Sequence, residues 1–322
     1  MAMVLTVSAS SALAWNDFGH MVVAAVAYQS LARTPTVRSK VDALLKLHPD
    51  HGQWIEGVPA QQQGEVAFLM ASRWADAIRR DSAYVNDGED NGETPVEPAA
   101  SLNIGYEDKA RHKYWHYKDL GFSTDGTPVD PPKVPNAATA IKQFRATLAS
   151  PRASAALKSY DLAWLLHLVG DVHQPLHATS RFTADMPHGD VGGNRVALCA
   201  WPCRDELHAF WDSVLGRDET PAAAMAFAAT LEPAPAEEAR ILDVDTWLSE
   251  SQAIAKTHVY MPPIGARGTG RYALDESYKA HALEVARRRV ALAGARLGRL
   301  LREALQAAAQ HRHVRAKSAR QR

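Results

Sequence analysis

The sequence predicts a mainly α-helical protein that folds as one all-helical domain. Apolar residues recur at intervals of three and four through most of the chain, as on the buried face of a helix. Between these segments, no run alternates polar and apolar residues as a half-buried strand would. The 322 residues, 46% of them hydrophobic, are enough to bury one large core. We therefore expect a single folded domain over residues 15–308.

Eight segments carry the helical pattern, and prolines separate several of them. The expected helices cover approximately residues 19–32, 36–47, 65–80, 138–149, 152–173, 204–215, 220–231 and, longest, Leu274–Ala309, with breaks at Pro35, Pro49, Pro175 and Pro221. Residues 82–110 and 119–137 are rich in Asp, Gly, Asn and Pro. They are expected to be long loops inside the domain, because helical segments lie on both sides of each.

The two ends of the chain differ from the domain between them. Residues 1–14 are apolar and end in Ala12-Leu13-Ala14, the small-x-small pattern of a signal-peptide cleavage site, although a basic start is missing. We expect a cleaved signal peptide and export to the periplasm or the medium; a disordered apolar N-terminus is the alternative. No other run approaches the ~20 apolar residues of a membrane span. Residues 309–322 are basic and are expected to form a flexible tail.

The chain has two cysteines, Cys199 and Cys203. An even number of cysteines in an exported protein favours a disulfide over free thiols, and three intervening residues permit a small closed loop. Zinc ligation by this pair is the less favoured interpretation, because two thiolates without a second cysteine pair are a weak zinc signal.

A His-x-x-x-Asp pair occurs twice, as His167 with Asp171 and as His208 with Asp212. Residues four apart lie on the same face of a helix, so each pair presents an imidazole and a carboxylate to one point. Both groups are ordinary zinc ligands. The sequence therefore predicts that helices hold a divalent metal at two places.

Zinc sites usually take three or four protein groups, so these pairs need partners. The upstream candidates are His20, Asp76 and His116. Each alone would more often be an ordinary hydrogen-bonded residue. His173 is set aside, because two residues from Asp171 it points away from that face and is expected to support a ligand or to lie on the surface. The formal net charge is zero, so any phosphate binding must be focused locally, for example by zinc.

Several short motifs occur in order along the chain. They are Trp-x-x-x-Gly-His at Trp15–His20, Trp-Ala-Asp at Trp74–Asp76, His116, the block His167–His177, Gly189–Asn194, His208–Asp212, Trp247 with Glu250–Ser251, and Ala293–Leu297. In these residues the chain resembles the zinc-dependent single-strand-specific nucleases and 3'-nucleotidases of the mung bean nuclease type, distant relatives of the zinc phospholipases C. The resemblance covers nearly all of residues 15–308.

The resemblance implies a helical fold with three zinc ions at the bottom of a cleft. It places the first zinc on Asp76, His116, His167 and Asp171, the second on His177, His208 and Asp212, and the third on His20, Asp171 and the main chain of Trp15. Asp171 would bridge the first and third ions. Three zinc ions bring a charge of about +6 against about −3 from the aspartates, which gives a positive focus for phosphate.

The reaction implied by the resemblance is in-line hydrolysis of a phosphodiester that leaves a 5'-phosphate. A hydroxide between the first and third zinc ions would attack, and the second zinc would stabilise the leaving 3'-oxygen. Arg79 matches the family's cation for the developing charge, Tyr117 and Asp119 match a site that stacks on and hydrogen-bonds a base, and Asn194 would reach the base or phosphate. The alternatives are a surface arginine, core packing of Tyr117 and a turn role for Asn194.

The expected substrates are single-stranded DNA, RNA and 3'-nucleotides, and a monomer is expected. A zinc phospholipase C is one alternative, but its last helical pair resembles His-x-x-x-Glu, whereas this chain has Asp212. A non-catalytic zinc protein is the other alternative. Structural zinc sites are closed by four protein ligands, whereas the second site here has three, which leaves a position for water or substrate.

Overall fold

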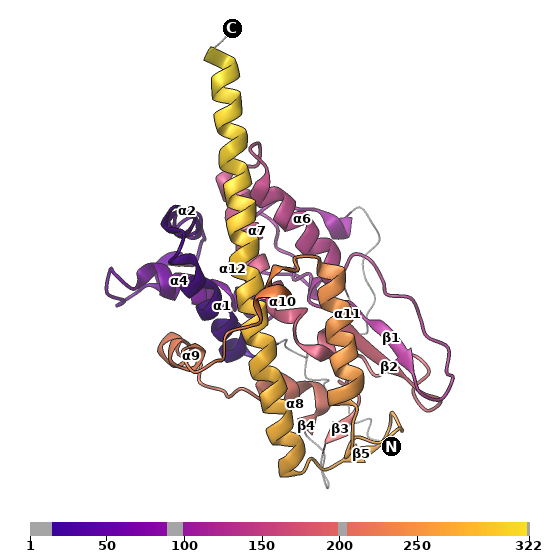
Figure 1. Ribbon diagram of the computed structural model, residues 1–322. Coiled ribbons are helices and arrows are strands. Elements are labelled where there is room, and N and C mark those ends of the chain that lie inside the picture. Colours follow the sequence, from indigo (N-terminus) through magenta and orange to yellow (C-terminus); the bar gives the residue numbers. More distant parts are fainter. Residues whose placement is uncertain (1–14, 89–98, 199–204, 321–322) are drawn as a thin grey trace.

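The computed structural model describes residues 15–88, 99–198 and 205–320 and is mainly helical, as predicted (Figure 1). The α-helices are α1 (Asp17–Leu31), α2 (Pro35–Leu45), α3 (His51–Trp54), α4 (Gln63–Ala71), α5 (Trp74–Ala77), α6 (Ala137–Ala149), α7 (Ala155–Asp171), α8 (Leu207–Ser213), α9 (Pro221–Ala228), α10 (Ala236–Arg240), α11 (Val244–Ile254) and α12 (Glu276–Arg320). Three short 3-10 turns are η1 (Ala99–Ser101), η2 (Lys113–Trp115) and η3 (Pro175–Ala178), and η4 (Ala255–Val259) is a π-helix that continues α11.

Several boundaries differ from the sequence prediction. The helix expected over residues 65–80 is two helices, α4 and α5, with a break at Ser72 and Arg73. Helix α11 was not predicted, nor were the short helices α3 and α10. Helix α12 continues past Ala309 to Arg320. Pro35, Pro175 and Pro221 stand at the first positions of α2, η3 and α9, where a missing N–H costs nothing.

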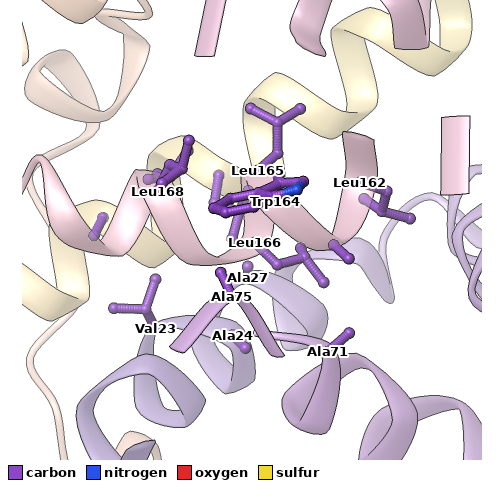
Figure 2. Packing of buried hydrophobic residues seen from close by; sticks show 14 of the residues in the cluster. Val23, Ala24, Ala27, Ala71, Ala75, Leu162, Trp164, Leu165, Leu166 and Leu168 are labelled. Atoms are coloured by element: carbon purple, nitrogen blue, oxygen red, sulfur yellow. The ribbon is translucent and has the colours of Figure 1, made fainter. Parts of the chain in front are cut away.

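Helix α7 lies at the centre of the molecule because it is apolar on every side. Ser154 caps it by accepting a hydrogen bond from the backbone N–H of Leu157, and every residue from Lys158 to Asp171 is buried. Its apolar side chains, with Trp164 the largest, pack against α1, α4 and α5 (Figure 2). Polar residues on this helix are therefore carried into the interior.

The long helix α12 passes through the middle of the fold and packs along α1, α6 and α7 (Figure 1). Its buried side chains, among them Val290, Leu297 and Leu301, join the same apolar cluster as α1 and α7. Helix α11 lies beside η3 and also contacts α6. Helices α11 and α12 thus flank the segment that follows α7.

Among the described helices, none combines the length and the apolar composition that a membrane span requires.

Short strands were not expected from the sequence, but they lie close to the candidate site. Strand β1 (Leu120–Ser123) pairs in parallel with β2 (Thr179–Phe182), with Leu120 opposite Thr179. Each strand begins within two residues of a candidate site residue, Asp119 before β1 and His177 before β2. Continued backwards, this register sets Asp119 opposite Ala178, one residue from His177, so the pairing brings the two segments together. A second small sheet has the order β4 (Asp205–Glu206), β3 (Ala197–Leu198) and β5 (Arg271–Tyr272).

Candidate metal centre

The structure brings eight of the predicted ligand side chains together in three groups. In each group the candidate ligand atoms all lie within 4.8 Å of one another. Group A is Asp76, His116 and His167; group B is His177, His208 and Asp212; group C is His20, His167 and Asp171. All eight residues are buried. Residues that are up to about 190 positions apart in the sequence therefore converge on one region.

Two helices supply the predicted pairs, one pair each. On α7, Nε2 of His167 lies 3.4 Å from Oδ2 of Asp171. On α8, Nε2 of His208 lies 3.5 Å from Oδ2 of Asp212. Ligand atoms at 2.0–2.2 Å from one tetrahedral zinc are about 3.3–3.6 Å apart, so both separations fit a shared ion.

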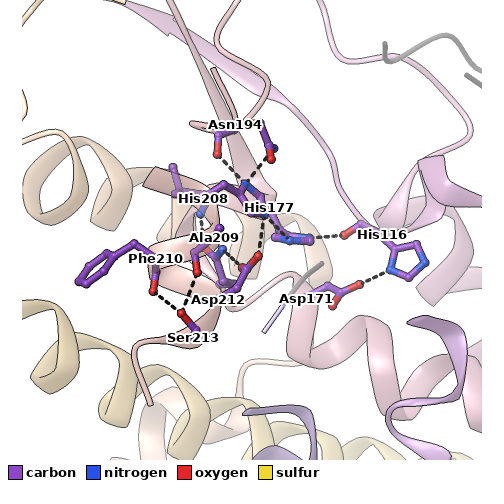
Figure 3. A network of polar contacts seen from close by, with 12 residues as sticks. His116, Asp171, His177, Asn194, His208, Ala209, Phe210, Asp212 and Ser213 are labelled. Atoms are coloured by element: carbon purple, nitrogen blue, oxygen red, sulfur yellow. Dashed lines mark hydrogen bonds and ion pairs between the residues drawn. The ribbon is translucent and has the colours of Figure 1, made fainter. Parts of the chain in front are cut away.

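The carboxylate of Asp171 faces two groups at once. Its Oδ1 lies 3.2 Å from Nε2 of His20 in group C. Its Oδ2 lies 3.1 Å from Nδ1 of His116, which belongs to group A, and Figure 3 shows this contact. One carboxylate therefore offers one oxygen to each of two neighbouring groups, which is the arrangement of a bridging ligand.

Three histidines of the groups direct their second ring nitrogen to a backbone carbonyl. The pairs are His167 Nδ1 with Ser72 at 2.8 Å, His177 Nδ1 with His116 at 2.8 Å, and His208 Nδ1 with Gly192 at 2.6 Å. A carbonyl can only accept, so Nδ1 carries the proton in each ring and Nε2 has a free lone pair. Metal-bound histidines typically have this outer hydrogen bond.

Several buried atoms in these groups make no hydrogen bond to the described residues. They are both ring nitrogens of His20, Oδ2 of Asp76, Nε2 of His116 and Oδ1 of Asp171. Nε2 of His20 and Oδ1 of Asp171 lie 3.2 Å apart but are not aligned as donor and acceptor. Buried polar atoms without a partner are rare in native proteins, because their desolvation is not compensated. Neutral imidazoles and carboxylates that point at one another are the donors that zinc takes, so the residues fit this metal.

Burial also shifts the protonation of the ligands. It lowers the pKa values of His20, His116 and His177 well below their ordinary range, with neighbouring histidines acting in the same direction. Burial raises the pKa values of Asp171 and Asp212 well above theirs. The histidines are thus held neutral, in the ligand form, while the buried carboxylates require a cation to stay ionised.

Glycines permit two of these contacts. A Cβ atom on Gly170 of α7 would lie 2.8 Å from Nδ1 of His20, so only glycine lets this ring approach the helix. Gly192, whose carbonyl holds His208, has a φ of 59° and would place a Cβ 2.4 Å from the carbonyl oxygen of Leu176. A side chain at either position would displace a candidate ligand.

The comparisons with known proteins agree with this geometry. The sequence model of the S1/P1 nuclease family matches residues 15–306. The chain belongs to the S1/P1 nuclease family. It is also 25% identical, over 208 residues, to Nuclease P1 of Penicillium citrinum and to Nuclease PA3 of Penicillium sp. These matches cover 62% of this chain and 58% of each relative, so the chain spans less than two thirds of the length of either.

In this S1/P1 family member, Arg79 reaches a residue of group A, although not from the helix that was expected. Helix α5 ends at Ala77, so Arg79 lies beyond the helix that carries Asp76. Its Nη1 nevertheless lies 3.3 Å from Oδ1 of Asp76, and its side chain is only 8% exposed. The alternative of an ordinary surface arginine is therefore wrong.

Tyr117 and Asp119 line a cavity of about 220 Å³ whose wall includes the residue that follows His116 of group A. Tyr117 directly follows His116, and the backbone N–H of Lys118 donates to the carbonyl of His177 at 3.0 Å. Lys133 and Phe182 also line this cavity. Burial and the nearby Asp190 raise the pKa of Asp119 to about 7, against the opposing effect of Lys133.

The other predicted residues have different surroundings. The amide of Asn194 donates to the carbonyl of Val191 at 2.6 Å and lies 3.2 Å from Nδ1 of His208 (Figure 3). Trp15 is fully buried, and the backbone N–H of the following residue, Asn16, donates to the carbonyl of Asp212 at 3.0 Å. Cys199 and Cys203 fall outside the described residues, so their disulfide remains a prediction.

Sequence reasoning missed Gln174, which lies in the block between His167 and His177. Its Nε2 donates to Oδ1 of Asp212 at 2.7 Å, so it orients a group B carboxylate. Its place within the most specific motif was a signal that could have identified it.

His173 is not in any of the three groups, as expected, but it is buried, so a surface position is excluded.

Proposed function

We propose that this protein is an exported zinc-dependent nuclease that hydrolyses phosphodiester bonds in single-stranded DNA and RNA. The products would carry 5'-phosphates, and the enzyme would also remove the phosphate of 3'-nucleotides. The observation that carries this proposal is the arrangement of the three His/Asp groups around Asp171, beside a cavity that begins at the residue after His116. Family membership supports the same chemistry.

Three zinc ions would be held by the three groups, with Asp171 shared between groups A and C. The main-chain amine and carbonyl of Trp15 would complete group C, consistent with the position of Trp15 beside Gly170 of α7, where the ring of His20 also lies. Zinc bound at these positions would lower the pKa of a water molecule from 15.7 toward ~7 and polarise a phosphate oxygen. Group B has three protein ligands, so a coordination position remains for substrate.

The side chains around the groups would place and stabilise the substrate. Arg79 lies against Asp76 with little exposure, so its guanidinium would face a phosphate held at group A and stabilise charge that develops there. Asn194, beside His208, would hydrogen-bond the phosphate or the base. These groups are fixed by burial and by hydrogen bonds before substrate binds, which is the condition for effective electrostatic stabilisation.

A preference for single strands would follow from the position of the cavity. A base would stack on Tyr117 and hydrogen-bond Asp119 while its phosphate reaches the adjacent ligands. A base that is paired in a duplex cannot leave its partner to enter such a cavity without loss of pairing and stacking energy. Stacking on an aromatic side chain tolerates every base, so we expect little sequence preference.

Hydrolysis of one oligonucleotide, as a single strand and as a duplex, tests the proposal. DNA and RNA versions are incubated with the mature protein, and the product ends and zinc content are determined. We expect cleavage of the single strands to 5'-phosphate products, inhibition by a chelator and recovery with zinc. Phosphatidylcholine is assayed in parallel. Hydrolysis of this lipid with intact oligonucleotides would instead identify a phospholipase C.

A further inference from the structure

The segment between the end of α7 and η3 connects the metal groups. Asp171 is the last residue of α7, and His177 lies in η3 only six residues later. Between them, residues 172–174 form a turn, here called the ligand turn. Its last residue, Gln174, also bonds Asp212 at 2.7 Å. The position of group B relative to groups A and C therefore depends on this turn.

Side chains from α11 and α12 hydrogen-bond the backbone of the ligand turn. Oγ of Ser251 donates to the carbonyl of Val172 at 2.6 Å. Nε of Arg289 donates to the carbonyl of His173 at 3.0 Å. The same arginine donates to Oγ of Ser251 at 2.7 Å, so the two contacts support each other.

The third contact is a hydrogen bond to the ring of His173. Nδ1 of His173 lies 2.8 Å from the carbonyl of Val169 and must carry the proton, because a carbonyl only accepts. Nε2 is then an acceptor, and Nη1 of Arg296 lies 3.0 Å from it. Both the backbone and the ring of His173 are therefore fixed by arginines of α12.

The two arginines share one carboxylate. Glu250 on α11 accepts from Nη1 and Nη2 of Arg296 at 2.6 and 2.8 Å, and its Oε2 lies 3.5 Å from Nη1 of Arg289. The side chain of Arg296 is fully buried and that of Arg289 is 5% exposed. The side chain of Glu250 is 28% exposed, so loss of this carboxylate leaves two buried guanidinium groups without their shared counter-charge.

We propose that Glu250, Arg289 and Arg296 are positioning residues that set the distance between the metal groups through the ligand turn. In the described structure they bond the turn, α10, Ser251 and one another rather than the metal ligands themselves. The inference rests on the proposed metal centre. Loss of a group that hydrogen-bonds a metal ligand directly typically costs about 10–100-fold in metal affinity. Because these residues act one contact further away, through the turn, we expect the lower end of that range, about 10-fold.

The variant R296K tests the proposal. Lysine keeps the charge and one contact with Glu250, but its single ammonium cannot make the two-pronged contact and also reach His173. We expect zinc to be lost at a chelator concentration about 10-fold lower than for wild type. The visible absorption of Co²⁺-substituted protein should change, because it reports ligand geometry. We expect kcat to fall more than KM rises.

The variant R299K is the matched control, since Arg299 lies on the same helix and bonds the exposed Glu303 at 3.2 Å. It should retain zinc like wild type.

The variant E250Q leaves two arginines without their carboxylate, so it should weaken zinc binding more than R296K does. If E250Q does not fold, the result for R296K alone tests the proposal. A folded R296K with wild-type zinc retention and Co²⁺ spectrum would overturn the inference, whatever its thermal stability. Wild-type protein that binds no zinc would instead refute the proposed function.

Discussion

The substitution D171N tests the bridging role of Asp171 most directly. An asparagine side chain has nearly the same shape, but it presents one oxygen and one NH2 group and carries no charge. Since Oδ1 of Asp171 faces His20 and Oδ2 faces His116, the NH2 group must point into group A or group C. At least one zinc would lose an anionic ligand and meet a hydrogen-bond donor.

The minimum loss of zinc affinity and of zinc-dependent stabilisation in D171N can be estimated. Loss of an outer-shell partner costs about 10–100-fold in metal affinity, so loss of a shared ligand should cost at least about 100-fold. At free zinc well above both dissociation constants, a 100-fold weaker site removes about 2.7 kcal/mol of zinc-dependent stabilisation. For a chain of this size that corresponds to a decrease of roughly 5 °C in the zinc-induced rise of Tm.

The metal-free protein should respond in the opposite direction. Burial raises the pKa of Asp171 well above its ordinary range, because an ionised carboxylate is unfavourable in the interior. Burying this carboxyl group without a cation lowers the stability of the metal-free fold, and a neutral asparagine avoids that loss. Metal-free D171N should be at least as stable as metal-free wild type, while its stabilisation by zinc is smaller. Thermal unfolding with and without zinc measures both quantities.

D161N is the matched control for this experiment. Asp161 lies on the same helix, is fully buried and accepts a hydrogen bond from Asn103 at 2.8 Å, but it belongs to none of the three groups. Burial raises its pKa to about 7, so the neutral amide is a mild change. D161N should keep the zinc-induced rise of Tm and the nuclease activity. A D171N protein with full zinc occupancy and near-normal turnover would refute the bridging assignment.

Three further predictions concern the surroundings of the metal centre. R79M should lower kcat by about 10²–10³-fold with zinc retained, whereas R80M, at the exposed neighbouring position, should not; metal analysis and kinetics at saturating oligonucleotide measure this. Because the pKa of Asp119 is about 7, its ionisation should raise KM for the anionic substrate as the pH increases from 6 to 8, and D119N should show a flat profile. A chain that begins at Trp15 should bind one zinc more than a chain that retains residues 1–14, because only a free α-amine is a good ligand; equal zinc content in both would contradict this.

The parts of the site that could be predicted from the sequence are those set by local geometry. The pairs on α7 and α8 follow from the spacing of four residues in a helix, which holds whatever the helix packs against. Their association with His20, Asp76 and His116 came from the family resemblance, because no spacing rule joins residues so far apart.

Tertiary contacts explain most of the errors. The break between α4 and α5 lies at Ser72, whose carbonyl accepts a hydrogen bond from His167, a residue 95 positions away. The spacing of apolar residues in the sequence contains no information about such a distant contact. Helix α11 did have a local signal, since Asp243 caps it and Val244, Trp247 and Leu248 share a buried face. Strand β1 has only four residues, too few for an alternating pattern to stand out.

His112 belongs to none of the motifs recognised in the sequence. In the structure it is buried, with its two ring nitrogens 2.7 Å from carboxylate oxygens of Asp87 and Asp108. Hydrogen bonds to these carboxylates raise its pKa, although burial acts against them. The partners lie in a loop up to 25 residues away in the sequence, so neither the contacts nor the burial could be inferred from a periodic pattern.

The hydrogen bond from Nδ1 of His177 to the carbonyl of His116 joins group B to the backbone of a group A ligand. An ion that binds group A restrains His116 and, through this hydrogen bond, also the ring of His177. The ring of His177 therefore loses conformational freedom before an ion binds group B. The second ion then meets a site that is already ordered, and by linkage the first ion is held more tightly once the second is present. We therefore expect the centre to fill and empty cooperatively, so that partly loaded molecules are scarce during a zinc titration.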